Sequence, residues 1–451
     1  MPARLTTATT LARAAGQASR LLRRGGGTAL PGVVARFVDR DVACQLAARL
    51  EHGSILVSGT NGKTTTTRLI SALLGAAGQQ VVHNRAGANL MSGITTALLE
   101  TSGDTGLFEV DEATLPAAIA ELRPKLVLCL NLFRDQLDRY GELNTLGSKW
   151  AAALSRLSAD TTVLLNADDP LVASLGQNLS CRVEYFGLDS PDQQLSAMQH
   201  AADSIYCPRC GTLLAFEAIY YGHLGHYACH SCGFARPMPA FVAKNVRLAL
   251  DAPSTLAVGD LQIETSLPGL YNVYNVLAAA AAALTLGLPP ESIASTVQAF
   301  SGAFGRTEIV EIDGRRLRLL LAKNPVGFNE LIRTLLLDPE PLDLYIALND
   351  RIADGEDVSW IWDVDLEQVA NRCATVLVGG TRAEDMAVRL KYAGFPPASL
   401  QLTSGHSSAI RQLLASTPKG ATAYAIPTYT AMLDLRHALA ASGAVRQFWE
   451  D

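Results

Sequence analysis

The segment Ile55–Ile70, with the sequence ILVSGTNGKTTTTRLI, constrains the fold more than any other stretch of this chain. Its first three apolar residues predict the end of a buried strand, its glycines a tight loop, and its threonine run the start of a helix. In that context the loop N–H groups bind phosphate oxygens, and the helix N-terminus adds a favourable dipole. The segment therefore predicts nucleotide binding on an α/β fold. The alternative is a plain turn, and the match is partial because Val57 stands where the usual motif begins with glycine.

Three side chains near this loop have expected roles. The Lys63 ammonium would reach the β- and γ-phosphates, and the Thr64 hydroxyl would bind Mg²⁺. Glu109 ends an apolar strand, where a carboxylate is placed to bind the same ion. An acidic turn at the surface fits Asp111 and Glu112 better than it fits Glu109.

The loop SGTNGKTT also resembles the ATP loop of the Mur ligase family. Members of that family join amino acids to peptidoglycan precursors through an acyl phosphate, so the resemblance implies ATP and Mg²⁺. It implies that Glu109 is a magnesium ligand. It also implies that Lys63 and Arg306, the latter in the element GRTE, act as catalytic residues on the phosphates. The residues that the resemblance places at the nucleotide are Gly59, Thr60, Asn61, Gly62, Lys63, Thr64, Thr65, Asn166, Asp169 and Asn272.

Several positions depart from the Mur ligase pattern. Gln136 stands where the family usually has a histidine that helps to bind metal. Lys149 is the nearby candidate for the carbamylated lysine of many members, although a surface helical lysine fits it better. The phosphate loop begins only at about residue 55, so we expect the family's N-terminal domain for the UDP moiety to be absent. Such an enzyme would recognise a substrate presented differently, for example on a lipid carrier.

Two C-x-x-C pairs lie 18 residues apart, a spacing that is a strong zinc signature. Four thiolates bind Zn²⁺ in a closed site, which predicts a structural zinc ribbon rather than a catalytic centre. Redox chemistry is the alternative. His223, His226 and His230 are expected on the surface of the ribbon rather than among the ligands. The predicted ligands are Cys207, Cys210, Cys229 and Cys232.

Ordinary Mur ligases lack this insertion. The chain is similar in this respect to the MurT-type subunits of lipid II isoglutaminyl synthase, which it also resembles at Ala322–Pro325, AKNP. The resemblance implies a Mur-ligase-like ATP-binding domain over residues 39–304, with the ribbon inserted at about residues 203–236. Beyond it, apolar runs alternate with helical patterns and predict a smaller, doubly wound α/β domain over residues 305–451. Those runs are Leu342–Leu348, Ala374–Gly380 and Ala421–Pro427.

Residues 1–38 form a cationic lead with six arginines and no acidic residue. Three interpretations stay open: a helix that rests on an anionic membrane surface, a transit peptide, or a solvated helix that packs onto the first domain. The net charge of the whole chain is −6, which argues against nucleic acid as a partner. Four cysteines have metal spacing and four are scattered, which suits a reducing, cytoplasmic compartment. We expect the protein there, or peripherally at the inner face of the membrane.

The segment 349–363 is expected to bind a partner, because it combines five acids with Trp360 and Trp362 at the carboxyl end of a predicted strand. The MurT resemblance implies that Asp357 completes a Cys-His pair on a separate glutaminase subunit of the GatD type, in a heterodimer. The remaining cysteines lack the Gly-flanked turn that exposes a nucleophile. The chain is therefore expected to need that partner as its source of ammonia.

The resemblance implies one reaction above others. The enzyme would phosphorylate the α-carboxyl of D-Glu in the lipid II stem peptide, and ammonia would attack the acyl phosphate to give D-isoglutamine. An amino-acid ligase of the Mur or folylpolyglutamate type is the first alternative. A nucleotide-gated scaffold without chemistry is the second, and Lys63, Glu109 and Arg306 weigh against it.

Overall fold

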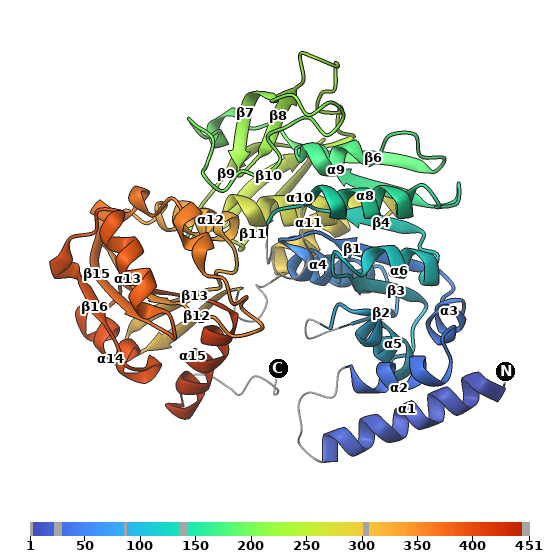
Figure 1. Cartoon of the computed structure of the whole chain (residues 1–451), viewed down its shortest axis with the longest axis horizontal. Helices are drawn as coiled ribbons and strands as arrows, with labels where there is room; N and C mark the ends of the chain where they lie inside the picture. Colours follow the sequence, from blue (N-terminus) through green and yellow to red (C-terminus); the bar gives the residue numbers. More distant parts are fainter. Residues whose placement is uncertain (1–2, 22–28, 85–87, 135–142, 301–305, 444–451) are drawn as a thin grey trace.

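The computed structural model describes residues 3–21, 29–84, 88–134, 143–300 and 306–443 (Figure 1). Two large sheets organise this part of the chain. The first has nine strands in the order β11-β10-β9-β6-β5-β4-β1-β3-β2, and it is parallel apart from the β9–β10 and β10–β11 pairs. Its strands are β1 (Ser54–Ser58), β2 (Val81–His83), β3 (Thr105–Glu109), β4 (Leu126–Cys129), β5 (Thr162–Asn166), β6 (Arg182–Leu188), β9 (Phe241–Arg247), β10 (Ser254–Val258) and β11 (Leu261–Thr265).

Helices cover both faces of this sheet because successive residues of a strand point to opposite sides. On β1, Ile55 and Val57 pack into one apolar core, whereas Leu56 packs into the other. The helices of this part are α1 (Ala3–Leu21), α2 (Leu30–Val38), α3 (Val42–Ala47), α4 (Lys63–Ala76), α5 (Met91–Glu100), α6 (Leu115–Leu122), α8 (Leu143–Leu154), α9 (Pro170–Ser174), α10 (Leu270–Thr285) and α11 (Pro290–Ala299).

The second sheet has six strands in the order β12-β13-β17-β14-β15-β16. All its pairs are parallel except β12–β13, so an antiparallel edge strand joins the doubly wound sheet that the sequence predicts. The strands are β12 (Arg306–Ile312), β13 (Arg315–Leu320), β14 (Leu342–Ala347), β15 (Cys373–Gly379), β16 (Leu400–Leu402) and β17 (Thr422–Pro427). The helices are α12 (Pro325–Leu335), α13 (Ala383–Tyr392), α14 (His406–Ser416) and α15 (Tyr429–Ala441).

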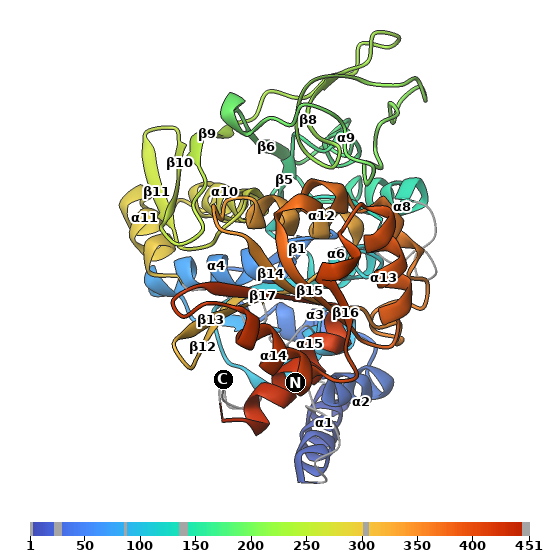
Figure 2. The ribbon, with the colours of Figure 1, turned by 90° about the vertical axis from the view of Figure 1, so that its left-hand side faces the viewer.

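A small hairpin, β7 (Ala215–Tyr221) and β8 (Leu224–Ala228), interrupts the first sheet between β6 and β9. Because β6 and β9 are parallel neighbours, the inserted segment occupies the position of a crossover connection. It stands at the top of the molecule in Figures 1 and 2. Short 3₁₀ helices complete the described chain: η1 (Pro191–Gln193), η2 (Ser359–Asp363), η3 (Leu366–Gln368), η4 (Ala370–Arg372) and η5 (Pro397–Ser399).

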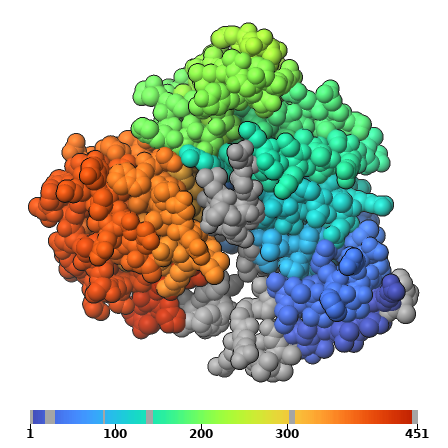
Figure 3. Space-filling view, in the orientation of Figure 1, coloured from blue at the N-terminus to red at the C-terminus, as the bar shows by residue number. Residues whose placement is uncertain are grey.

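The two sheets are joined by direct contacts around α12. Val326 of this helix packs into the core of the nine-stranded sheet. Arg333, further along α12, donates to the carbonyls of Tyr220 (2.8 Å) and Gln193 (2.7 Å). In Figure 3 the orange atoms of the C-terminal part lie beside the green atoms of the first. No described helix combines the length and the apolar character needed to cross a bilayer.

Candidate active site

The predicted phosphate loop lies between β1 and α4, at the carboxyl edge of the nine-stranded sheet. Two of its residues must be glycine. Gly62 has φ +90°, and a Cβ there would lie 2.1 Å from Asn275 Oδ1. Gly59 has φ +145°, and a Cβ there would lie 2.9 Å from the Asn131 nitrogen. The loop therefore fits closely between the end of β4 and helix α10, with the N-terminus of α4 facing it.

Lys63 begins α4 and is buried over the loop. Its Nζ donates to the carbonyls of Gly59 (2.5 Å) and Thr60 (3.2 Å) and to Glu112 Oε1 (3.1 Å). The ammonium thus lies among the groups that shape the loop, and Glu112 balances its charge.

The expectation of a surface acidic turn at Asp111 and Glu112 is wrong, because both residues are buried. Trp150 of α8 covers the turn and donates from Nε1 to the Glu112 carbonyl at 2.8 Å. The Asp111 N–H donates to the Asn89 carbonyl at 3.0 Å. Lys149, beside this tryptophan, is exposed on α8, as expected of a surface lysine.

Glu109 and Thr64, the two predicted magnesium ligands, extend from adjacent elements. Glu109 ends β3, is buried, and pairs in parallel register with Val57 of β1. The Asn84 side chain clamps its backbone, accepting from the Glu109 N–H (2.9 Å) and donating to its carbonyl (2.8 Å). Thr64 is half-buried in the first turn of α4. A carboxylate and a hydroxyl at the rim of a phosphate loop are suitable donors for Mg²⁺.

Asn131 and Asn324 are contacts of the loop that the sequence did not reveal. Asn131 Oδ1 accepts from the Asn61 N–H at 2.8 Å, and its Nδ2 donates to the Asn61 carbonyl at 3.0 Å. Asn324, the N-cap of α12, donates from Nδ2 to Asn61 Oδ1 at 3.0 Å. Asn61 is therefore bonded both to its own sheet and to the C-terminal part. An asparagine at the end of the buried strand LVLC was the available signal for Asn131.

Asn166 and Asp169 lie at the adjacent β5–α9 corner, where they bond to neighbouring backbone groups. Asp169 caps α9, accepting at Oδ1 from the N–H groups of Leu171 and Val172, and its Oδ2 accepts from Leu132 N–H at 2.8 Å. Asn166 Nδ2 donates to the Leu130 carbonyl at 2.9 Å. Both residues therefore hold the strand end that carries Asn131.

Asn272 lies in the first turn of α10 and reaches the loop helix through Asn275. Its Nδ2 donates to the Pro268 carbonyl (2.8 Å), and its Oδ1 accepts from Asn275 Nδ2 (3.1 Å). Asn275 in turn accepts from the Thr66 hydroxyl at 3.4 Å. Two expected residues cannot be placed: Gln136 and the side chain of Arg306 lie outside the described part, although the Arg306 backbone begins β12.

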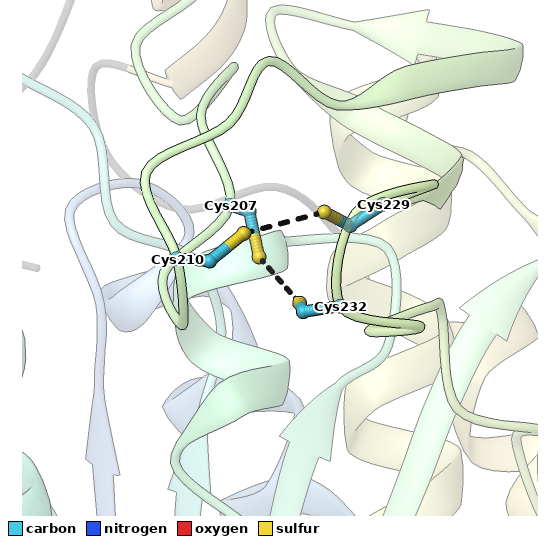
Figure 4. A group of neighbouring side chains, drawn as sticks. All are labelled: Cys207, Cys210, Cys229 and Cys232. Atoms are coloured by element: carbon cyan, nitrogen blue, oxygen red, sulfur yellow. Dashed lines mark hydrogen bonds between the residues drawn. The ribbon is translucent and has the colours of Figure 1, made fainter.

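The four predicted zinc ligands come together in the inserted segment (Figure 4), and their sulfur atoms all lie within 4.8 Å of one another. The Sγ–Sγ distance is 3.5 Å for Cys207–Cys232 and for Cys210–Cys229. Four sulfurs at the usual zinc–sulfur bond length would be about 3.8 Å apart, so the donor set fits Zn²⁺. Gly211 and Gly233 adopt positive φ of 74° and 71°, which lets each C-x-x-C turn present both thiols to one point.

The histidine expectation holds only in part. His223 is fully buried, its Nδ1 accepting from the Asp203 N–H at 3.2 Å, so its predicted surface position is wrong. His226 is half-buried and bonded to the Leu188 carbonyl at 2.8 Å. His230 is exposed, as expected, and none of the three joins the cysteine cluster.

Comparison with known proteins agrees with this geometry. Residues 57–283 match the Mur ligase middle domain, and residues 321–432 match the MurT ligase C-terminal region. The subunit MurT of lipid II isoglutaminyl synthase (glutamine-hydrolyzing) from Streptococcus pneumoniae is 36% identical, over 97% of this chain and 98% of its own. The chain belongs to the MurT family. It is therefore a ligase of the Mur ligase type, whose members use ATP and Mg²⁺ in peptidoglycan biosynthesis.

Two further relatives place this MurT family member more broadly. The MurT subunit from Staphylococcus aureus (strain N315) is 36% identical, over 86% of this chain and 87% of its own. The structure of a pseudomurein peptide ligase type C from Methanothermus fervidus superposes with a TM-score of 0.67 at 22% identity, covering 88% of this chain and 80% of that one. The latter shows the common fold: a Mur-ligase-like α/β architecture.

In this MurT family member, Asp357 lies on the wall of a surface pocket of about 420 Å³. The carboxylate is exposed, and its Oδ1 accepts from the Ser359 N–H at 2.8 Å. Hydrogen bonds from the backbone and side chain of Ser359 lower the pKa of Asp357, so it is charged at neutral pH. Trp362, half-exposed on the same wall, packs against the exposed ring of Tyr392 with centroids 5.8 Å apart.

Trp360 lies on the other side of this segment and packs against Phe328 of α12, with ring centroids 6.4 Å apart. One tryptophan therefore anchors the segment and the other faces solvent. Arg134, in the segment that follows β4, pairs with Asp203 and with Asp363 (3.3 Å), the residue after Trp362. The pocket is thus connected to the nucleotide-binding sheet.

Proposed function

We propose that this chain is the synthetase subunit of a lipid II isoglutaminyl synthase. It would convert the D-Glu α-carboxyl of the lipid II stem peptide to the amide of D-isoglutamine. The observation that carries the proposal is the near-full-length match to a MurT subunit, 36% identical over 97% of the chain. A relative that matched only the ATP-binding part could be any Mur ligase, whereas this match extends over nearly the whole chain, including the C-terminal part that carries Asp357.

The reaction would have two steps. A carboxylate oxygen of the substrate attacks the γ-phosphorus of ATP, which releases ADP and forms an acyl phosphate. Ammonia then attacks the acyl carbon, inorganic phosphate leaves, and the nitrogen loses a proton to give the amide. Charge develops on the phosphoryl oxygens in the first step, so preorganised cations and N–H donors are the groups that accelerate it.

The residues of this chain fit those requirements. The loop from Gly59 to Gly62 and the N-terminus of α4 would hold the phosphates, and Lys63 would leave its loop carbonyls to follow the transferred group. Arg306 is proposed as a second cation on the phosphates. Glu109 and Thr64 would hold Mg²⁺, which supplies charge neutralisation at the phosphates when bound. Zn²⁺ would be structural, because four cysteines leave no open coordination position.

Ammonia would come from a glutaminase partner of the GatD type in a heterodimer. Three of the four cysteines outside the zinc cluster are poor nucleophile candidates: Cys129 and Cys181 are buried, and burial raises the pKa of Cys373 to about 12. The fourth, Cys44, is half-buried and has no glycine beside it. Asp357, exposed and anionic, is available to orient a catalytic histidine on a partner that docks there. The substrate is lipid-linked and ATP is cytoplasmic, so we place the reaction at the inner face of the membrane.

The test separates the two ammonia sources. Asp357→Asn should lose glutamine-driven amidation while keeping amidation driven by ammonium chloride and keeping the complex, since only the partner's histidine loses its orienting charge. Glu356→Gln changes the neighbouring exposed acid and should retain both activities. Full glutamine-dependent activity of Asp357→Asn would disprove the split triad. Incorporation of an amino acid instead of ammonia would favour the Mur or folylpolyglutamate alternative.

A further inference from the structure

The N-terminal hairpin of helices α1 and α2 exposes an apolar stripe that the proposed chemistry does not use. On α2, Leu30, Val33 and Phe37 share one side of the helix and are 44%, 52% and 91% exposed. The opposite side of α2 carries Pro31, Gly32 and Ala35, all buried. When one face of a helix is packed against the protein and the opposite face is apolar and exposed, the exposed face is a candidate binding surface.

The stripe belongs to a firmly packed unit rather than to a loose end. Leu5, Ala8 and Ala12 of α1 are buried in the core that α2 and α5 share. The Gly32 N–H donates to the Thr96 hydroxyl of α5 at 2.9 Å, and a Cβ on Gly32 would lie 1.8 Å from the Ser92 carbonyl oxygen. The exposed stripe is therefore a fixed surface of the folded protein.

The charge around this stripe is the reverse of that on the rest of the molecule. Residues 1–38 hold six arginines and no acid, whereas the remaining residues hold 31 basic and 43 acidic side chains. Arg4 and Arg13 are exposed on α1, whereas the charge of Arg40, exposed just beyond α2, is offset by the exposed Asp41 beside it. Arg36 is paired with Glu121 (2.5 Å), so it contributes less. A basic surface with an apolar stripe complements an anionic lipid surface.

We propose that the α1–α2 hairpin docks this enzyme flat on an anionic membrane, with Phe37 and Val33 inserted among the headgroups and Arg4 and Arg13 facing lipid phosphates. This inference rests on the proposed function, because a lipid-linked substrate lies in that membrane. It also suits the geometry. The hairpin packs on helix α5. Asn89 lies just before this helix, and its carbonyl accepts a hydrogen bond from the Asp111 N–H, close to Glu109 of the proposed magnesium site.

The position of the hairpin supports a single-sided attachment. Both Figure 1 and Figure 2 place α1 and α2 at the lower end of the molecule and the zinc ribbon at the upper end. Docking through the hairpin would therefore leave the ribbon away from the membrane. It would bring the edge of the nine-stranded sheet close to the headgroups.

The experiment measures co-sedimentation of the full chain with vesicles, without ATP, glutamine or lipid II. Vesicles of phosphatidylcholine with phosphatidylglycerol should bind the protein, and vesicles of phosphatidylcholine alone should bind it far less. Val33→Ser/Phe37→Ser should weaken binding about tenfold. Arg4→Glu and Arg13→Glu should each weaken it about fivefold or more at low salt. All four positions are exposed, so these variants should fold normally.

Matched controls lie on other surfaces. Met238→Ser removes an apolar side chain that is 92% exposed near the ribbon, and Arg411→Glu reverses an exposed charge on α14. Both should bind vesicles like the wild type, as should Asp357→Asn. Unchanged binding of the hairpin variants would overturn the proposal. A wild-type dimer that Phe37→Ser dissociates would also overturn it, by assigning the stripe to a second copy of this chain.

Discussion

Lys63 serves both the folded loop and the proposed reaction, so its replacement has two separable effects. Lys63→Ala removes the mobile cation that would follow the transferred phosphoryl group, and we expect ATP-dependent turnover to fall about 10³-fold or more. Phosphate release by the purified complex measures this loss. Lys149→Ala removes an exposed lysine of α8 and should keep normal turnover. Comparable activity in the two variants would exclude the nucleotide role of Lys63.

Glu112 forms the buried ion pair that stabilises the charged form of Lys63 inside the protein. Glu112→Gln would leave a buried ammonium with carbonyl partners only, and we expect the free energy of unfolding to fall by about 3 kcal/mol. Urea denaturation measures the change. The double variant Lys63→Met/Glu112→Gln should recover part of the loss, since the unpaired charge is gone. Strict additivity of the two substitutions would show that the pair does not act as a unit.

For single residues, the sequence predicts those that belong to a local motif, but it does not predict their contacts with residues distant in the chain. Gly59, Gly62 and Lys63 follow from a motif whose residues are neighbours in the chain. The burial of Glu112 depends on Trp150, and the contact of Asn61 depends on Asn324, 263 positions away. Neither partner leaves a local pattern, so neither could be inferred from spacing.

Among the elements, the inserted ribbon makes the sharpest prediction. Elemental analysis should give one zinc per chain. Cys207→Ser should lower the thermal midpoint and the zinc content together, because metal-binding energy is folding energy in such a module. Cys44→Ser, at a half-buried cysteine outside the cluster, should change neither. A fully folded, metal-free protein would contradict a structural role for the ion.

The strands and helices were largely predictable because their periodicity is local. The apolar runs of the C-terminal part correspond to β14, β15 and β17 within a residue or two. The buried position of His223 was not predictable. A hairpin of aromatic and polar residues is usually expected at the surface, and the burial of this one depends on its packing against the large sheet. The antiparallel edge strand β12 likewise depends on a tertiary pairing.

At the scale of the whole molecule, the stability of the junction between the two sheets should depend on the protonation of Glu330 on α12. The residue is fully buried, and within the described structure neither carboxylate oxygen has a hydrogen-bond partner. Burial raises the pKa of Glu330 to about 7, with Arg333 opposing the shift. The folded protein thus retains a proton that the unfolded chain releases, and stability falls as pH rises from about 4.5 to 7.

Glu330→Gln should therefore stabilise the protein by about 3 kcal/mol at pH 8 and have little effect near pH 4.5. Unfolding free energies at the two pH values test this. Glu291→Gln, an exposed glutamate on α11, serves as the control and should show no such difference. Equal effects of Glu330→Gln at both pH values would exclude a proton held at the junction.

β17 has a consequence for the order in which this protein can be made. It is the last of the six strands along the chain, yet it lies between β13 and β14 and pairs with both. During translation those two strands emerge with open edges that stay unpaired until Pro427 has been added. The surface with Asp357 and Trp362 is thus a late product of synthesis. The partner that we propose would therefore bind only chains that extend past Pro427.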